Sequence, residues 1–214
     1  MSGSIVSPEL RARVRGVATP IAVGFGIAIV AAAAAWQEAW LAAGVLVLVG
    51  GVFDLFDGAL ARATGRTSRL GAFMDSVADR AGEGVVYVGI IAGCLWSGLR
   101  EGVVLGAAAM AAAFLVSYVR AKSESLGFTS GTGMAAVGVA PREMRIVILA
   151  LGLVLAGIGG GAGRYPVPAG QVRIDEPFLG GTIPLLAALG LITVLATVTT
   201  IQRIVHVIRQ TPQE

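Results

Sequence analysis

Four aspartates lie in apolar parts of the chain, where charged residues are unusual. Asp54 and Asp57 are three residues apart, and Asp75 and Asp79 are four apart. At 3.6 residues per turn, either spacing puts both carboxylates on one side of a helix. A charge inside a bilayer is costly, so such residues indicate a functional site. Because carboxylate oxygens suit Mg²⁺, Mn²⁺ and Ca²⁺, we expect these four side chains to hold divalent cations.

Two other interpretations of these aspartates stay open. The carboxylates could pair with arginines and only fix helix packing, and Arg62 and Arg80 are close to them in sequence. They could also form the ion site of a cation-coupled transporter. Transporter sites usually lie near the bilayer midplane between two related halves, whereas these residues cluster at one end of a predicted helical hairpin.

The segments that carry the aspartates are long and apolar. The chain has 214 residues, of which 56% are hydrophobic and 14% charged; soluble domains average about 25% charged residues. A membrane-spanning helix needs about 20 predominantly apolar residues. The sequence therefore predicts an all-α integral membrane protein with six transmembrane helices. They are expected at residues 19–36, 39–63, 70–97, 102–123, 137–157 and 182–205.

The N-terminal segment differs from the six expected spans. Residues 1–17 combine three arginines with apolar residues such as Leu10 and Val14. This mixture is typical of an amphipathic helix that lies on a membrane surface. We expect three parts: a cytoplasmic juxtamembrane helix at 1–17, the six-helix domain at 18–206, and a cytoplasmic tail at 207–214.

Basic residues indicate the orientation of the spans. Six spans place both termini on one side, and that side collects all 16 Lys and Arg residues except Arg100, Arg164 and Arg173. Because cytoplasmic loops are enriched in Lys and Arg, we expect a multi-pass plasma-membrane protein with its termini and aspartates facing the cytoplasm. The net charge of +3 then reflects basic loops, so we expect no nucleic-acid partner.

The four aspartates belong to a longer motif. It reads D-x-x-D-G-x-x-A-R-x8-G-x-x-x-D-x-x-x-D from Asp54 to Asp79. This pattern resembles the signature of the CDP-alcohol phosphotransferases, also called CDP-alcohol phosphatidyltransferases. The resemblance covers essentially the whole chain. It implies dependence on Mg²⁺ or Mn²⁺, two ions per active site, and assembly as a homodimer.

The resemblance also implies a reaction and residue roles. Family members move the phosphatidyl or archaetidyl group of a CDP-linked lipid to the hydroxyl of a polar alcohol and release CMP. By similarity, the four aspartates bind metal, and Asp79 is also the catalytic base. The implied CDP-lipid contacts are Pro20, Ile21, Ala22, Val23, Gly58, Ala61, Arg62, Ser68 and Gly71.

A second group of basic residues bears on the acceptor. Four arginines lie on the predicted side of the aspartates: Arg120, Arg142, Arg145 and Arg203. Arginine pairs bidentately with phosphate, although these residues also fit the general excess of basic residues on the cytoplasmic side. Their segments resemble the family branch that makes phosphatidylinositol phosphate or its archaeal ether-lipid counterpart. We therefore expect inositol 1-phosphate as the acceptor, with glycerol 3-phosphate as the alternative.

Overall fold

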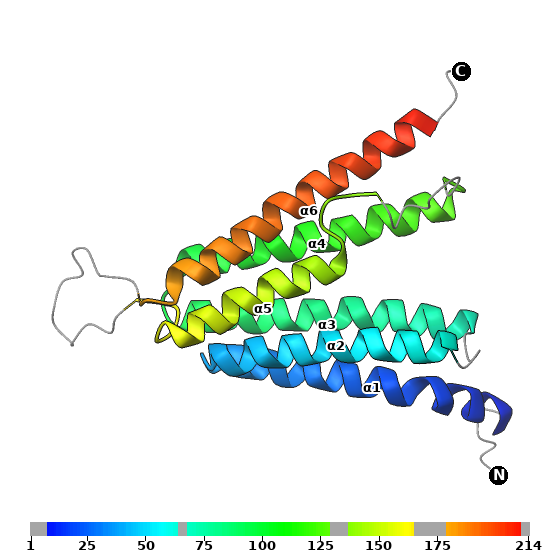
Figure 1. Ribbon diagram of the computed structural model, residues 1–214, viewed down its shortest axis with the longest axis horizontal. Coiled ribbons are helices and arrows are strands. Elements are labelled where there is room, and N and C mark those ends of the chain that lie inside the picture. Colours follow the sequence, from blue (N-terminus) through cyan, green and yellow to red (C-terminus); the bar gives the residue numbers. More distant parts are fainter. Residues whose placement is uncertain (1–7, 64–67, 129–136, 165–178, 211–214) are drawn as a thin grey trace, which may run out of the picture.

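The computed structural model describes residues 8–63, 68–128, 137–164 and 179–210, without the side chains of 8–20 and 57–62. All six elements of the described chain are α-helices (Figure 1). They are α1 (Pro8–Trp36), α2 (Trp40–Ala63), α3 (Arg69–Trp96), α4 (Arg100–Ser125), α5 (Arg142–Ile158) and α6 (Thr182–Gln210). The predicted spans correspond to these helices one for one, so the prediction of an all-helical fold is confirmed.

The N-terminal segment is not a separate helix in the described chain. α1 begins at Pro8 and continues without a break through the first predicted span to Trp36, over 29 residues. The prediction of a seventh, surface-lying helix is therefore wrong for the described residues. Gly16 lies near the end of the predicted N-terminal helix, and one glycine costs a helix only about 1 kcal/mol. Proline at the first helical position also favours the observed start.

The helices pack in a closed cycle of neighbours. α1 packs against α2 and α3, α3 against α4, α4 against α6, α6 against α5, and α5 against α2. α2 and α3 are consecutive in sequence, yet no comparable contact joins them in the described part of the chain. The close α2–α3 hairpin expected from their short connection is therefore not observed. Instead, the two helices stand on either side of a pocket.

Glycines permit a close crossing of α1 and α3. A Cβ at Gly89 of α3 would lie 2.3 Å from the carbonyl oxygen of Ala32 in α1, and one at Gly93 would lie 2.2 Å from that of Ala35. These glycines are four residues apart and so share a face of α3. Small residues at this spacing let membrane helices approach until their backbones touch. The crossing thereby fixes α3, the helix that carries two of the four aspartates.

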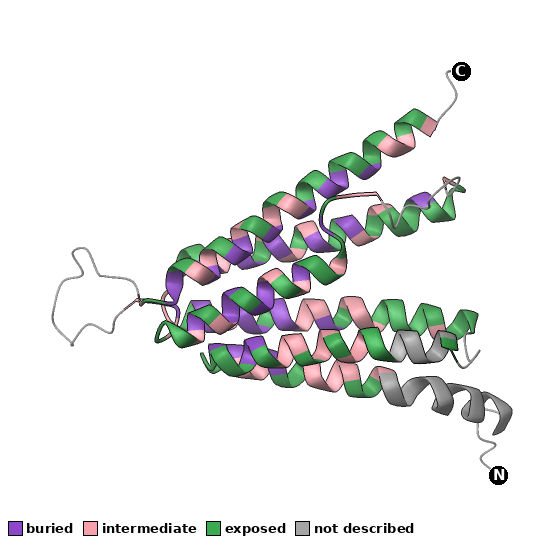
Figure 2. Ribbon diagram, viewed as in Figure 1, coloured by how far each residue is buried: buried purple, intermediate pink, exposed green. Residues whose placement is uncertain are grey.

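Buried residues gather toward one end of α1, α2 and α3 (Figure 2). The core there includes Trp40, Tyr87, Ile90 and Leu153. Toward the other end, these three helices carry mostly half-buried and exposed residues, and the motif aspartates lie in that part. The core thus holds one end of the bundle together, while the opposite end is open enough for a site.

Two described helices are long and apolar enough to cross a bilayer. These are α4 and α6, each with a mean hydropathy of 2.1. α3 carries the acidic residues of the site, and α5 has 17 residues, the short limit of the range for a spanning helix. Large apolar side chains are exposed on each helix, among them Val30, Val52, Val88, Val104, Leu151 and Ile201. An apolar surface of this extent indicates contact with lipid.

Candidate active site

Three of the four predicted metal-binding aspartates line one pocket. Asp54 comes from α2, whereas Asp75 and Asp79 come from α3, and α1 and α5 complete the walls. A Cβ at Gly24 of α1 would lie 3.0 Å from Asp54 Oδ1, so a glycine at this position leaves room for the carboxylate. The side chain of Asp57 lies outside the described residues. The structure therefore brings together the two halves of the sequence motif.

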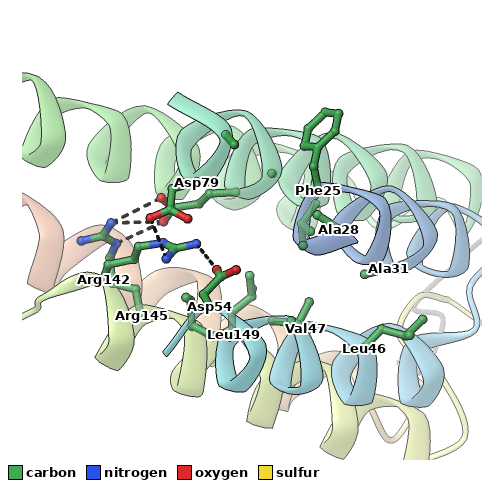
Figure 3. A pocket seen from close by; sticks show the side chains of 18 of the residues that line it. Phe25, Ala28, Ala31, Leu46, Val47, Asp54, Asp79, Arg142, Arg145 and Leu149 are labelled. Atoms are coloured by element: carbon green, nitrogen blue, oxygen red, sulfur yellow. Dashed lines mark hydrogen bonds and ion pairs between the residues drawn. The ribbon is translucent and has the colours of Figure 1, made fainter. Parts of the chain in front are cut away.

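Arg142, the first residue of α5, lies between two of these carboxylates (Figure 3). Its Nη2 donates to Asp54 Oδ2 at 2.8 Å, and its Nη1 lies 2.9 Å from Asp79 Oδ2. The sequence suggested Arg62 or Arg80 as partners of the aspartates and assigned Arg142 to the acceptor. In the structure Arg142 is also the arginine that pairs with the aspartates, because α5 packs beside α2 and places its first residue at the pocket. The side chain of Arg62 is outside the described part.

The donor chemistry of the pocket suits hard divalent cations. Its lining contains carboxylates and no Cys or His among the described residues, and carboxylate oxygens favour Mg²⁺, Mn²⁺ or Ca²⁺. The guanidinium between Asp54 and Asp79 also indicates that this pair requires positive charge. However, no three acidic, His or Cys side chains in the described chain are grouped closely enough to hold an ion. Asp57, the fourth predicted ligand, is not among the described side chains.

Glu83 continues the acidic face of α3 one turn beyond the motif. It accepts hydrogen bonds from Arg80 in the same helix and from Arg145 of α5, whose Nη2 is 3.2 Å away. Arg80 also donates to Ser117 Oγ of α4 at 2.9 Å, and Arg145 donates to the Ala140 carbonyl at 3.1 Å. This network joins three helices beside the aspartates. Asp75, Asp79 and Glu83 are spaced by four residues, and this spacing in the sequence indicates that Glu83 shares the face of α3 that carries the aspartates.

A wider pocket of about 800 Å³ joins the aspartates to the predicted acceptor arginines. Asp75 and Asp79 form part of its wall, opposite residues from α4, α5 and α6. The residues that line this pocket include Arg120, Arg142, Arg145 and Arg203. Several arginines around one pocket can bind a phosphate group through charge-assisted hydrogen bonds. The structure thus places all four arginines where one anionic ligand could meet them near the carboxylates.

These arginines differ in how firmly the fold holds them. Arg145 and Arg203 are 2% and 4% exposed, respectively. Arg203 donates to the backbone carbonyls of Val116 and Val137, at 2.7 and 2.9 Å. Arg120 is exposed, and its partner among the described residues is a glutamate one turn further along α4. Two guanidinium groups are therefore part of the packed structure, while Arg120 can reorient without disturbing it.

The predicted CDP-lipid contacts do not all reach the pocket. Ile21 lines it, whereas Ala22 and Val23 are exposed on α1 and are not part of its lining. Ser68 caps α3, because its hydroxyl accepts a hydrogen bond from the Gly71 backbone N–H at 3.0 Å. The other predicted contacts lie outside the described side chains: Pro20, Gly58, Ala61 and Arg62.

Sequence comparison identifies the family. The model of the CDP-alcohol phosphatidyltransferase family matches residues 17–208, which include every predicted site residue. The chain therefore belongs to the CDP-alcohol phosphatidyltransferase family, and the prediction made from the aspartate motif is confirmed.

Curated relatives narrow the comparison. The archaetidylinositol phosphate synthase of Methanothermobacter thermautotrophicus is 34% identical over 184 residues, covering 86% of this chain and 78% of that protein. The phosphatidylinositol phosphate synthase of Streptomyces avermitilis is 37% identical over 175 residues, covering 79% of this chain but only 63% of that protein. The chain is thus similar to synthases of inositol-phosphate lipids.

Solved structures show the same fold. The phosphatidylinositol phosphate synthase of Mycobacterium tuberculosis, solved with CDP-DAG bound, superposes with a TM-score of 0.71 over 95% of this chain and 93% of that one. A second structure of that protein, in complex with manganese and citrate, gives a TM-score of 0.70 over 98% and 94% of the two chains. Both share 23% sequence identity with this chain, so the likeness establishes the fold alone.

Proposed function

We propose that this chain transfers a phosphatidyl or archaetidyl group from a CDP-linked lipid to the hydroxyl of inositol 1-phosphate, with release of CMP. The observation that carries the proposal is the wide pocket in which Asp75 and Asp79 meet the arginines of α4, α5 and α6. Family membership supports the CDP-linked donor and argues against a cation-coupled transporter. The relatives' names favour inositol phosphate over glycerol 3-phosphate.

We assign the divalent cations to the motif aspartates. Asp54, Asp75 and Asp79 share one pocket. Asp57 follows Asp54 by three residues, toward the C-terminal end of α2. Mg²⁺ or Mn²⁺, expected as two ions, would supply positive charge to the pyrophosphate of the donor and to the departing CMP. The manganese in a solved structure of similar fold supports this choice.

Asp79 is the proposed base. Its side chain lines both the aspartate pocket and the wide arginine pocket, which makes it suited to act between donor and acceptor. Its carboxylate would accept the proton of the acceptor hydroxyl as that oxygen bonds to the lipid-bearing phosphorus. The bond between this phosphorus and the CMP oxygen breaks in the same displacement, and CMP leaves with the electron pair.

The arginines would bind the phosphate of the acceptor. Arg145 and Arg203 supply charge at fixed positions because the fold already holds them. Arg120 and Arg142 can adjust to the ligand, since their partners among the described residues are carboxylates. Fixed and adjustable guanidinium groups around one pocket favour a small, doubly charged phosphate ester.

The donor lipid has an apolar approach to the aspartates between α2 and α5. A lateral opening of about 320 Å³ reaches Asp54, Asp75 and Asp79. Its apolar wall consists of Leu48, Val52, Leu55, Ile146 and Val147. We assign the acyl or ether chains of the donor to this opening, because it would let the lipid keep its tails in the bilayer while its headgroup enters the pocket.

We propose that all six helices span the plasma membrane. The long apolar helices α4 and α6 support a membrane location. The distribution of basic residues supports cytoplasmic termini and a cytoplasmic active site. The embedded domain would comprise residues 18–206, with 1–17 and 207–214 on the cytoplasmic side, and we expect a homodimer.

A CMP-release assay tests the function. Purified protein in detergent is given CDP-diacylglycerol or its ether-lipid analogue, Mg²⁺ or Mn²⁺, and either inositol 1-phosphate, glycerol 3-phosphate or inositol. We expect CMP release with inositol 1-phosphate, its loss in EDTA, and its return on addition of metal. Faster CMP release with glycerol 3-phosphate than with inositol 1-phosphate would identify glycerol 3-phosphate as the acceptor. No release with any acceptor in either metal would overturn the proposed function.

A further inference from the structure

Arg142 stands at the junction of the three openings in the site. It lines the aspartate pocket, the lateral opening between α2 and α5, and the wide arginine pocket. Asp75 and Asp79 also line all three. Any donor, cation or acceptor in these spaces must therefore share them with the Arg142 guanidinium.

The contacts of Arg142 set it apart from its neighbours. Its two terminal nitrogens contact Asp54 and Asp79, both of which the proposed function assigns to metal. Its Nε is buried and has no hydrogen-bond partner in the described chain. By contrast, Arg145 and Arg203 donate to backbone carbonyls. Within the described chain, the Arg142 side chain is thus held by the two carboxylates and by no backbone group.

A carboxylate oxygen cannot serve a guanidinium and a divalent cation equally well at the same time. Arg142 occupies one oxygen each of Asp54 and Asp79. A cation bound by these side chains would take up the same lone pairs and would repel the guanidinium.

We propose that Arg142 and the divalent cation compete for Asp54 and Asp79, and that the phosphate of the acceptor takes up the displaced guanidinium. The inference rests on the proposed function, and it adds a coupling between two ligands. Cation binding releases an arginine into the wide pocket, and a phosphate in that pocket keeps the arginine away from the carboxylates. By linkage, each ligand then raises the affinity for the other by the same factor.

Binding of Mn²⁺ to the full-length protein, measured by electron paramagnetic resonance, tests the coupling without turnover. For the wild type, we expect saturating inositol 1-phosphate to tighten Mn²⁺ binding by about fivefold or more, the lower end of typical allosteric couplings. This arm needs no substitution. An unchanged or weaker Mn²⁺ affinity in the presence of inositol 1-phosphate would overturn the proposal.

The Arg142→Gln variant tests the competition directly, with Arg120→Gln as the matched control. Without the competing charge, Arg142→Gln should bind Mn²⁺ about fivefold more tightly than the wild type and gain less than twofold from inositol 1-phosphate. Arg120→Gln, whose partner is Glu124, should bind Mn²⁺ as the wild type does. Weaker or unchanged binding by Arg142→Gln would refute the competition.

The outcomes separate this inference from the proposed function. If the wild type releases CMP but Arg142→Gln leaves the Mn²⁺ affinity unchanged, the coupling is rejected and the proposed function stands. A wild type that releases no CMP rejects the function, whereas tighter Mn²⁺ binding by Arg142→Gln would still establish the competition.

Discussion

At the residue level, positive charge near the aspartates is held in two ways. Arg145 and Arg203 are tied to buried acceptors and keep their places whatever ligand is present. Among the side chains that the structure describes, Arg142 and Arg120 pair with carboxylates, and competing ions can break such pairs. Substitutions in the two groups should therefore have different consequences, even though every one of these arginines lines the same pocket.

Asp79→Asn should separate catalysis from donor binding. An amide cannot accept the hydroxyl proton, so we expect CMP release to fall by at least about a hundredfold, the usual contribution of a general base. CDP-lipid affinity, measured by equilibrium binding, should change by only a few-fold. Glu143→Gln is the control, because this exposed acid lies outside the motif on the same rim. Turnover of Asp79→Asn near that of the control would remove Asp79 from the role of base.

Arg145→Ala should affect both stability and the acceptor. The substitution leaves the Ala140 carbonyl without its donor and breaks a buried pair with Glu83, at a cost of about 3 kcal/mol. The KM for inositol 1-phosphate should also rise far more than the KM for CDP-lipid. Thermal unfolding in detergent and steady-state kinetics measure the two effects.

The exposed arginine provides the comparison for that variant. Arg120→Ala should raise the same KM but change the unfolding free energy by less than about 0.5 kcal/mol, because exposed ion pairs contribute little. If both variants unfold at the same temperature as the wild type, the buried network around Glu83 does not stabilise the fold.

Individual residues act through the elements that carry them. The first residue of α5 reaches the aspartates because α5 packs against α2, and α3 is positioned by its glycine crossing with α1. The α1–α3 crossing leaves no space for a single methyl group at Gly89 or Gly93. Helix packing at the core end should therefore govern the geometry at the site end.

Gly89→Ala tests the crossing. The new methyl group would collide with backbone atoms of Ala32, and overpacking of this kind costs about 1–3 kcal/mol. We expect a lower unfolding temperature and lower activity. Gly190→Ala in α6 is the matched control, since a Cβ there meets nothing within 4 Å; it should be neutral or slightly stabilising. Equal stability of the two variants would contradict a tight α1–α3 contact.

The sequence predicts the elements well and their neighbours less well. Apolar length located all six helices, and the spacing of the aspartates located the pocket, because both properties are local. The pairing of Arg142 with Asp54 joins positions 88 residues apart. Nothing in the local sequence distinguishes Arg142 from the other arginines that are expected in the cytoplasmic loops. For the same reason, the separation of α2 from α3 could not be predicted.

For the molecule as a whole, the apolar core and the charged site lie toward opposite ends of the helices that carry the aspartates. Buried residues gather toward one end of α1, α2 and α3 (Figure 2). The aspartates that line the charged pockets lie toward the other end of α2 and α3. The proposed membrane orientation places the charged end at the cytoplasm, where a water-soluble acceptor and CMP can be exchanged. The lipid donor can then approach from the side, between α2 and α5.

Cysteine labelling tests this orientation. The chain has one cysteine, Cys94, which is buried, so a membrane-impermeant maleimide should react little with the wild type. Arg100→Cys, at the core end, should be labelled in intact cells. Leu126→Cys, at the far end of α4, should be labelled only after the cells are permeabilised. The reverse pattern would place the active site outside the cytoplasm.

The Arg142 contacts also bear on how the chain is built into a membrane. An uncompensated carboxylate in a spanning helix costs about 3 kcal/mol on insertion scales. Asp54 and Asp79 are synthesised before α5, so their partner arrives only when the fifth helix joins the bundle. A nascent chain that ends after α4 therefore lacks the arginine that pairs with Asp54 and Asp79, and insertion of α5 is the step that supplies it. Because the balancing cation is encoded in the chain itself, assembly can be completed before any metal is delivered.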